Sequence, residues 1–494
     1  MRCYLLAAFG GCLYFLGFAG FDVWPLALIA FVPLLGGLEH VTSVRRALSI
    51  GLTFGVVLNL GGYSWLLSTL EVFAGFPWLV CASIFALICV LQGGQVALFA
   101  ALLVLLRRRG RVSLLWAVPC WGVAELGYPL VFPTYLASSL HTLVVPSQVV
   151  ELGGPIPLSM GIVLVNAAIF GWLRARLRRV PASPWLLPAG VIVPALCLGY
   201  GLVRVPQVDQ AVAAAATLRV GMVQANMGLQ AKRTDRREGR RRHIEQSRAL
   251  ERSHRPDLIV WPETAVAAPI ALGVKRVEPI LGSLATPVLF GALSHSAPQG
   301  RARLHNSAIL ADVNGKVQGR AHKRYLLPFA EYIPLGERFP ALYDFSANSG
   351  RFAAGEGSPV VQLGPHRMGV MICYEDLMPS LSRLAANDGA TLLVNLTNDA
   401  WFGDTRAPHI HLALSKLRAI EQRRTLLRAT NSGVSAIIDP LGQVTKQSRL
   451  FERTTLAADV PLLDDKTIYA RLGDWPAWLA LVTLLLGIAV RRQS

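Results

Sequence analysis

The chain has 494 residues, of which 53% are hydrophobic, and its mean hydropathy is +0.44. This apolar share exceeds that of ordinary soluble enzymes, so the composition excludes a purely soluble multidomain protein and predicts membrane spans. The formal net charge is +18, but the Lys and Arg residues fall mainly into short clusters beside apolar runs, which favours anionic phospholipid over nucleic acid as the partner.

Eight apolar runs are candidates for membrane helices, each of which needs about 20 residues to cross a bilayer. The runs cover residues 3–19, 23–37, 47–68, 77–106, 113–130, 155–173, 184–204 and 476–490. The sequence therefore predicts seven transmembrane helices within residues 1–204 and an eighth over residues 476–490. The first run also fits a secretory signal peptide, although a second run follows almost at once and no small-residue cleavage site stands out.

Arginine clusters mark every second connection between these runs. They follow the second, fourth and sixth spans and close the chain: Arg45 and Arg46; Arg107, Arg108, Arg109 and Arg111; Arg174, Arg176, Arg178 and Arg179; Arg491 and Arg492. If the spans alternate in direction, all these clusters lie on the side where Met1 begins. The positive-inside rule makes that side cytoplasmic, so we expect residues 205–475 outside the cytoplasm.

After the seventh span the pattern changes to short strands, turns and amphipathic helices. The strand-like segments are LRVGMVQANM, DLIVWPE, TPVLFGALS, NSAILADVNG, HRMGVMICYE, TLLVNLTNDAWFG and GVSAIIDPLG. Their alternation with helices predicts an α/β layered domain over residues 217–462. Asn314-Gly315 and the run 439–442 are typical of hairpin turns. The Arg- and Glu-rich stretch 236–255 predicts an exposed helix face, and the alternatives are a specific binding site and a face that rests on lipid headgroups.

Glu263 is the first candidate site residue along the chain. It follows the apolar segment DLIVW and a proline, so its carboxylate is fixed at a turn and not on a solvated helix. Strand ends are where α/β folds build their sites. Two interpretations stay open, a helix-capping acid and a general base.

Lys323 and Glu331 belong to the next candidate segment, AHKRYLLPFAEYIPLGE. Apolar and aromatic residues separate the two charges. A lysine held beside apolar residues can stabilise negative charge that develops on a carbonyl oxygen. The alternative is a surface lysine next to Arg324.

Cys373 is the only one of seven cysteines that lies outside the apolar runs. It has no disulfide partner in the polar domain, and no C-x-x-C or H-E-x-x-H spacing indicates zinc. The residue ends an apolar strand, and we expect an amphipathic helix to begin around Asp376, whose N-terminal amides favour the thiolate. Cys373 is therefore either a buried structural thiol or a nucleophile, for which Glu263 and Lys323 supply a base and an oxyanion donor.

These segments together resemble the Glu-Lys-Cys site of the nitrilase (carbon-nitrogen hydrolase) superfamily, and the whole layout resembles the apolipoprotein N-acyltransferase family. The supporting segments are VQANM at 223–227, WPE at 261–263, PFAEYIP at 328–334, CYE at 373–375, NLTNDAWFGD at 395–404 and the run 417–442. Seven spans before a nitrilase-like domain and one after it is that family's layout. Ala330 stands where glycine is more common, which is a minor departure.

The resemblance implies an αββα sandwich with Glu263 as general base, Lys323 as oxyanion stabiliser and Cys373 as nucleophile. Glu331 and Glu375 are then supporting acids. It further implies that an acyl chain passes from a glycerophospholipid, through a cysteine thioester, to the α-amine of a diacylglyceryl-cysteine lipoprotein, the last step of bacterial lipoprotein maturation. This places the chain in the inner membrane with its catalytic domain on the periplasmic side. The resemblance implies no metal and no diffusible cofactor.

Two other functions remain open. A membrane-tethered amidase or nitrilase would use the same three residues on a small amide, because the residues alone do not determine the acceptor. A transporter or lipid-binding protein with an inactive domain would carry charged residues within the spans. Apart from Glu125, the predicted spans are nearly uncharged, and Glu125 also fits a polar pocket between helices or the membrane interface.

Overall fold

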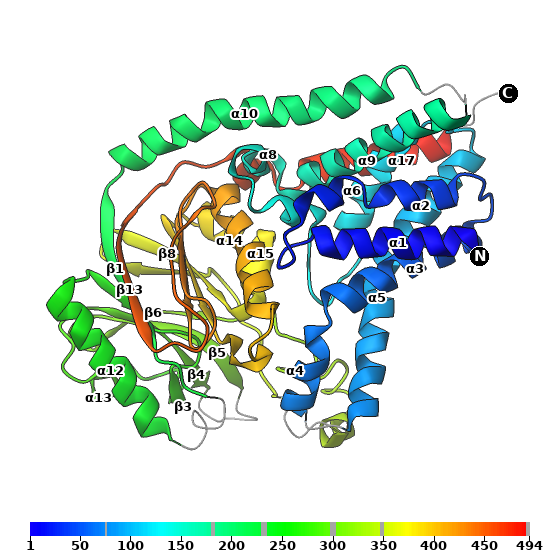
Figure 1. The fold of residues 1–494 in the computed structure, drawn as a ribbon. Helices are drawn as coiled ribbons and strands as arrows, with labels where there is room; N and C mark the ends of the chain where they lie inside the picture. The colour runs from blue at the N-terminus through cyan, green and yellow to red at the C-terminus, as the bar shows by residue number, and fades with distance from the viewer. Residues whose placement is uncertain (75–76, 179–182, 229–234, 297–302, 346–349, 491–494) are drawn as a thin grey trace. The chain divides into compact units, whose positions relative to one another are not determined.

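The structure is a computed structural model that describes residues 1–494 except 75–76, 179–182, 229–234, 297–302, 346–349 and 491–494 (Figure 1). The chain forms two compact units. Unit 1 comprises Met1–Glu71, Phe76–Gln207 and Leu472–Ser494, and unit 2 comprises Val72–Gly75 and Val208–Arg471. From the arginine clusters predicted to face the cytoplasm, Arg179, Arg491 and Arg492 lie outside the described residues.

Unit 1 is built from helices. They are α1 (Arg2–Gly17), η1 (Trp24–Leu28), α2 (Phe31–Leu38), α3 (Val44–Gly62), α4 (Trp65–Ala74), α5 (Trp78–Arg108), η2 (Leu114–Trp116), α6 (Ala117–Gly127), η3 (Leu136–Leu140), α7 (Val144–Ser147), α8 (Val150–Gly153), α9 (Pro155–Arg178), α10 (Leu186–Ala214) and α17 (Trp475–Ala489). Among the described residues, α3, α5, α9 and α10 are long and apolar enough to cross a membrane. Shorter apolar helices cover Arg2–Gly17, Trp24–Leu38, Leu114–Gly127 and Trp475–Ala489. These helices confirm the predicted class of a helical membrane domain.

The helix boundaries differ from the predicted runs at two places. The third run, 47–68, is divided, because α3 ends at Gly62 and α4 begins at Trp65. The seventh helix, α10, continues to Ala214, ten residues beyond its predicted end at residue 204. Both differences have the same cause. An apolar run indicates which residues can lie in an apolar environment, but it does not determine where the helix begins or ends.

Close contact between α3 and α5 depends on glycine. A Cβ atom on Gly55 would lie 2.4 Å from the Cα of Gly93, so only glycine lets these two backbones approach so closely. One turn further along, Gln92 donates a 3.0 Å hydrogen bond to the side-chain oxygen of Asn59, and both side chains are buried. Small residues and a buried amide pair therefore fix this helix pair, as in membrane helix packing.

Glu125 lies buried within unit 1 and is not at an exposed interface. Its Oε1 accepts a 2.7 Å hydrogen bond from the backbone N–H of Leu136, at the start of η3. A second buried acid, Glu151, forms an ion pair of 2.6 Å with Arg204 of α10. The two acids thus hold helices and connections in place, which favours a polar interhelical contact for Glu125.

Unit 2 contains two β-sheets. The first follows the order β13-β1-β2-β4-β5-β6, with β3 paired to β4, and the second follows β12-β11-β10-β9-β8-β7. Strands of the first sheet are β1 (Thr217–Gln224), β2 (Leu258–Val260), β3 (Val266–Ala271), β4 (Val288–His295), β5 (Leu304–Ala311), β6 (Val317–His322) and β13 (Thr454–Pro461). Those of the second are β7 (Val360–Leu363), β8 (His366–Ile372), β9 (Leu392–Thr397), β10 (Leu426–Thr430), β11 (Ala436–Ile438) and β12 (Val444–Gln447).

Helices cover the outer face of each sheet in unit 2 (Figure 1). They are α12 (Arg236–Ser253) and α13 (Glu278–Leu281) on the first sheet and α14 (Pro379–Asn387) and α15 (Ala407–Gln422) on the second; η4 (Pro340–Phe345), η5 (Cys373–Leu377), η6 (Asp399–Phe402) and α16 (Ile468–Leu472) are shorter. One hydrophobic core joins the facing sides of the two sheets, and two further cores lie under the helices. This four-layer arrangement confirms the predicted αββα sandwich.

Each of the seven strand-like segments contains a strand, whereas β3, β6, β7, β10, β12 and β13 lie outside those segments. Both predicted hairpin turns are confirmed. The first joins β5 to β6 with Gly315 at φ +69°, and the second joins β11 to β12 with Gly442 at φ +79°. Glycine adopts this left-handed conformation without steric cost.

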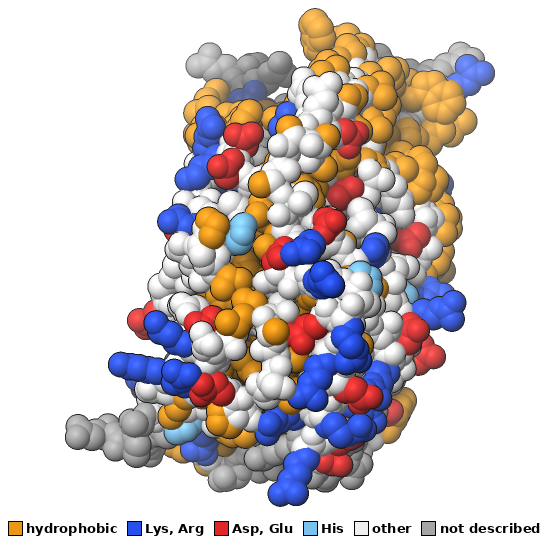
Figure 2. Space-filling view, turned by 90° about the vertical axis from the view of Figure 1, so that its left-hand side faces the viewer, with side chains coloured by type: hydrophobic (Ala, Val, Ile, Leu, Met, Phe, Trp, Pro, Cys, Tyr) orange, Lys and Arg blue, Asp and Glu red, His pale blue; other side chains and the backbone are white. Residues whose placement is uncertain are grey.

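Residues 236–253 of the stretch 236–255 form α12, which exposes most of its arginines. Its buried side includes His243, Ser247 and Leu250, while Arg241 and Arg242 pair with Glu238 on the same helix. Figure 2 shows acidic and basic side chains intermingled over the face that carries this helix. The helix is therefore a solvated cover of the first sheet, with its charges partly compensated by acids three or four residues away.

Candidate active site

Each of the three predicted catalytic side chains follows the end of a strand in unit 2. Glu263 comes three residues after β2, Lys323 directly follows β6, and Cys373 directly follows β8. The first two therefore extend from one sheet and the third from the other. The sequence predicted this placement at strand ends. It puts the three reactive side chains at the edge of the hydrophobic core of unit 2 and not inside it.

Asn306 joins the two acids of this site. Its side-chain nitrogen donates to Oε1 of Glu263 at 2.7 Å and to Oε1 of Glu331 at 3.2 Å. Glu331 Oε2 in turn accepts the backbone N–H of Leu327 at 2.9 Å and lies 2.8 Å from Nζ of Lys323. Glu263, Glu331 and Lys323 thus belong to one hydrogen-bonded cluster, and Asn306 was not predicted to be part of it.

Lys323 is 2% exposed and keeps its positive charge. Burial lowers the pKa of its ammonium group, but the nearby acidic groups of Cys373, Glu331 and Glu263 outweigh burial and hold that pKa well above its usual range. The ring of Tyr374 adds a cation–π contact, with Nζ 5.2 Å from the ring centroid. A permanently charged, desolvated ammonium group at this position is suited to stabilising an oxyanion.

Cys373 occupies a strained turn between β8 and η5. Its φ is +57°, in the left-handed region that few residues other than glycine adopt. The following α-helix begins at Pro379 and not at Asp376 as expected, because Pro379 occupies the first helical turn and η5 fills the interval. The residue as a whole is partly exposed, while its thiol is buried.

The surroundings of Cys373 act against the thiolate, whereas the helix amides predicted from the sequence would favour it. Burial and the negative charge of Glu263 raise the pKa of the Cys373 thiol well above its usual range, and Lys323 only partly opposes them. The thiol is therefore protonated at neutral pH. A nucleophile in this state needs a base that removes its proton during the reaction.

Glu375 holds the backbone around the site. Its carboxylate accepts hydrogen bonds from the N–H groups of Arg324 at 2.6 Å, Tyr325 at 3.0 Å and Ile372 at 2.7 Å. Burial raises the pKa of Glu375 to about 7. With its oxygens turned toward backbone donors, this residue positions Lys323 and Cys373, whose chain neighbours it binds.

A buried ionic network lies next to the turn at Cys373, and it was not predicted from the sequence. His411 Nε2 lies 2.8 Å from Asp376 and its Nδ1 lies 3.0 Å from Asp399. Arg428 pairs with the same two acids, at 2.9 Å for Asp399. Negative charge is thus balanced within the network, and the acids come from η5 and η6 on both sides of β9.

Two segments of the chain match known families. Residues 10–168 match the apolipoprotein N-acyltransferase N-terminal domain, and residues 219–465 match the carbon-nitrogen hydrolase family. The apolipoprotein N-acyltransferase of Geobacter metallireducens is 30% identical over 515 residues, covering 100% of this chain and 96% of that protein. The chain belongs to the apolipoprotein N-acyltransferase family. The counterpart from Azotobacter vinelandii is 32% identical and covers 99% and 95% of the two chains.

Membership in the apolipoprotein N-acyltransferase family confirms the resemblance predicted from the sequence. Its match extends over both units, which favours an acyltransferase over a tethered amidase. Among solved structures, Nit3 of Saccharomyces cerevisiae, a member of branch 10 of the nitrilase superfamily, shows a TM-score of 0.40 at 17% identity, over 52% of this chain and 93% of that chain.

Proposed function

We propose that this acyltransferase moves an acyl chain from a glycerophospholipid to the N-terminal α-amine of a diacylglyceryl-cysteine lipoprotein, with Cys373 as nucleophile, Glu263 as base and Lys323 as oxyanion stabiliser. The observation that carries this proposal is the single cluster in which Asn306 bonds both Glu263 and Glu331 while Lys323 pairs with Glu331. The charges of Glu263, Glu331 and Lys323 all act on the Cys373 thiol.

In the first half-reaction, Glu263 removes the thiol proton as the Cys373 sulfur attacks the ester carbonyl carbon of the phospholipid. The carbonyl oxygen becomes negative and the ammonium group of Lys323 stabilises it. The carbon–oxygen bond to glycerol then breaks, and Glu263 returns the proton to the leaving alcohol. A thioester on Cys373 and a lysophospholipid are the products.

In the second half-reaction, the neutral α-amine of the lipoprotein attacks the thioester carbonyl. Glu263 takes a proton from the attacking nitrogen, Lys323 again stabilises the oxyanion, and the proton passes to the departing sulfur of Cys373. An amide is formed and the thiol is restored. The net exchange is one ester for one amide, so no redox partner is required.

We further propose that residues 1–204 cross the bacterial inner membrane with seven spans, that residues 217–462 lie on the periplasmic side, and that residues 476–490 form the closing span. The arginine clusters beside alternate helices support this orientation. Both substrates are anchored in lipid, and confinement to one bilayer raises their effective concentration at the site.

A labelling experiment tests the transfer. Purified protein receives phospholipid with a labelled acyl chain and a diacylglyceryl-cysteine peptide in mixed micelles, and label is expected on the peptide amine. Glu263→Gln is expected to abolish the transfer, whereas Glu337→Gln, at an exposed glutamate on the same segment as Glu331, is expected to leave it intact. Label that accumulates as free fatty acid at the same rate with and without peptide instead indicates a hydrolase.

The orientation has its own test. A reporter that is active only outside the cytoplasm is fused after Val313, which is exposed in the β5–β6 hairpin, or after Gly110, which follows α5. We expect activity from the first fusion and none from the second. The reverse pattern rules out the proposed orientation without affecting the proposed chemistry.

A further inference from the structure

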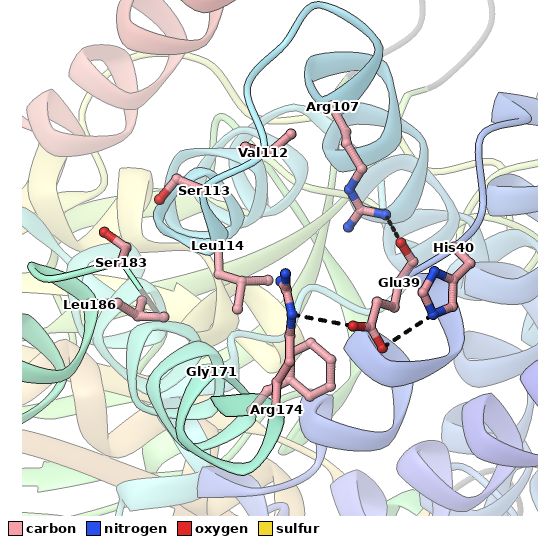
Figure 3. A pocket seen from close by; sticks show the side chains of 11 residues that line it. Glu39, His40, Arg107, Val112, Ser113, Leu114, Gly171, Arg174, Ser183 and Leu186 are labelled. Atoms are coloured by element: carbon pink, nitrogen blue, oxygen red, sulfur yellow. Dashed lines mark hydrogen bonds and ion pairs between the residues drawn. The ribbon is translucent and has the colours of Figure 1, made fainter. Parts of the chain in front are cut away.

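Unit 1 contains a cavity of about 500 Å³ (Figure 3). The ends of α2, α5 and α9 and the start of α10 surround it, and none of the proposed catalytic residues lines it. Its volume falls in the range of about 300–1,000 Å³ that is typical of small-molecule sites. The cavity is therefore a candidate for a second ligand.

Positive charge exceeds negative charge around this cavity. Arg178 pairs with Glu39, Nε of Arg174 lies 3.3 Å from the same carboxylate, and Arg107 lies beside them. Arg107 and Arg174 line the cavity together with the Glu39 carboxylate, which leaves an excess of one positive charge in the lining, and Arg178 binds the same carboxylate from outside it. A ligand with negative charge would balance this excess.

The arginines also keep hydrogen-bond donors for a ligand. An arginine has five N–H donors and no acceptor. Nη1 of Arg107 donates to the backbone oxygens of Leu38 at 2.6 Å and Glu39 at 2.9 Å, and the terminal nitrogens of Arg174 have no partner among the described residues. Figure 3 shows the Arg174 side chain extending into the space between Leu114 and Glu39. Planar guanidinium groups of this kind bind phosphate oxygens in pairs.

The side of the cavity away from Glu39 and His40 carries two leucines. Leu114 and Leu186 lie there in Figure 3 beside Ser113 and Ser183, and Phe170 also lines the cavity. A free inorganic anion would contact only the arginine side. A phosphate that carries an acyl chain would use both walls, with its charge at the arginines and its first methylene groups against the leucines.

The cavity lies at one end of the unit 1 helices. Leu186 is the first residue of α10, and residues 186–207 of this helix span about 33 Å at a rise of about 1.5 Å per residue. That length is close to the bilayer core of about 30 Å. The cavity therefore lies at the membrane surface opposite the one at which α10 leaves unit 1.

We infer that this cavity binds the phosphate headgroup of an anionic glycerophospholipid, separately from the acyl donor. Basic pockets between membrane helices recognise anionic headgroups in this way. Bound lipid holds the ends of α2, α5, α9 and α10 together and stabilises the folded chain. This inference does not depend on the chemistry proposed for Cys373.

Thermal unfolding of the full chain in a neutral detergent tests the inference. The protein is titrated with a diether phosphatidylglycerol, which cannot donate an acyl chain, with diether phosphatidylcholine, and with inorganic phosphate. Phosphatidylglycerol is expected to raise the unfolding temperature most. Arg174→Gln is expected to raise the lipid concentration at half-effect roughly fivefold, whereas Arg176→Gln, an exposed arginine of the same helix, leaves it unchanged.

A second pair of variants covers the case in which Arg174→Gln fails to fold. Val112 lines the cavity and is 66% exposed, so both Val112→Glu and Val112→Gln should fold. The glutamate repels a phosphate and is expected to weaken the lipid effect, while the glutamine is not. Equal effects of Arg174→Gln and Arg176→Gln, equal effects of the two Val112 variants, or a shift by inorganic phosphate as large as that by lipid overturns the inference.

Discussion

The side-chain amide of Asn395 donates a 2.8 Å hydrogen bond to the backbone oxygen of Cys373. The oxygen of the same amide accepts from Arg428 at 3.2 Å. The left-handed backbone at Cys373, which costs about 1–3 kcal/mol in a residue with a side chain, is thus connected through Asn395 to the buried pairs of Arg428 with Asp376 and Asp399. The network therefore stabilises the turn at Cys373.

Removal of Arg428 is expected to destabilise this network. Arg428→Met leaves Asp376 and Asp399 buried without their arginine partner, and breaking a buried pair costs about 3–5 kcal/mol of unfolding free energy. Arg453→Met breaks a surface pair with Glu245 and is expected to cost at most about 1 kcal/mol. Thermal unfolding of both variants measures the difference, and equal losses show that the network does not stabilise unit 2.

The contribution of His411 is expected to depend on pH. Burial and Arg428 lower the pKa of this histidine, but Asp376 and Asp399 outweigh them and raise it above the ordinary value of 6.5. Its stabilisation is therefore complete below about pH 6.5 and is lost as the pH rises through the higher folded pKa.

The difference in unfolding temperature between the natural protein and His411→Gln should accordingly shrink as the pH is raised from 6.5. His409→Gln changes an exposed histidine on the same helix and serves as control. A difference that stays constant or grows with pH contradicts the assignment of a protonated His411 to the folded state.

The Cys373 thiol is expected to react slowly with iodoacetamide at neutral pH, because its pKa is raised by burial and Glu263. Glu263→Gln removes a negative charge and should shift the alkylation profile to lower pH. Lys323→Met removes the opposing positive charge and should shift it to higher pH. Mass spectrometry of the Cys373 peptide follows the reaction, and shifts of the same sign in both variants are incompatible with this electrostatic account.

Asn306 is expected to act by positioning Glu263 and Glu331. Asn306→Ala removes both hydrogen bonds, and a misplaced base lowers the acyl transfer rate by about 100-fold with a smaller effect on the Michaelis constant. Asn314→Ala, in the exposed turn that follows the same strand, should have wild-type kinetics. Loss of folded protein in Asn306→Ala, with normal turnover of the folded fraction, would reduce Asn306 to a structural role.

The sequence predicted the layers and the strand ends of this fold because both depend on local patterns. Apolar runs that end at Ile372 and Val260 indicate where strands leave the core, so the positions of Cys373 and Glu263 after them followed directly. The start of the next helix was misplaced because Asp376 was taken for its first residue, although Pro379 is a stronger helix-start signal.

The ionic network and the state of the thiol could not be predicted in the same way. Arg428 lies 52 residues from Asp376 and 29 from Asp399, and the pairing of β9 with both β8 and β10 brings them together. Likewise, neighbouring amides favoured a thiolate at Cys373, whereas burial and Glu263 act in the opposite direction. Both features depend on burial and on charges that are distant in the sequence, and neither can be inferred from the residues next to Cys373 or Arg428.

Detection of an acyl thioester on Cys373 tests the central claim most directly. Purified protein is incubated with phospholipid of one acyl composition and without acceptor, and its intact mass is recorded before and after treatment with hydroxylamine. We predict a hydroxylamine-labile increase of one acyl group that maps to Cys373, is absent in Cys373→Ala, and disappears when a diacylglyceryl-cysteine peptide with a free amine is added but not when that amine is acetylated. An acyl group that persists in Cys373→Ala, or that leaves equally fast with the acetylated peptide, would contradict the account.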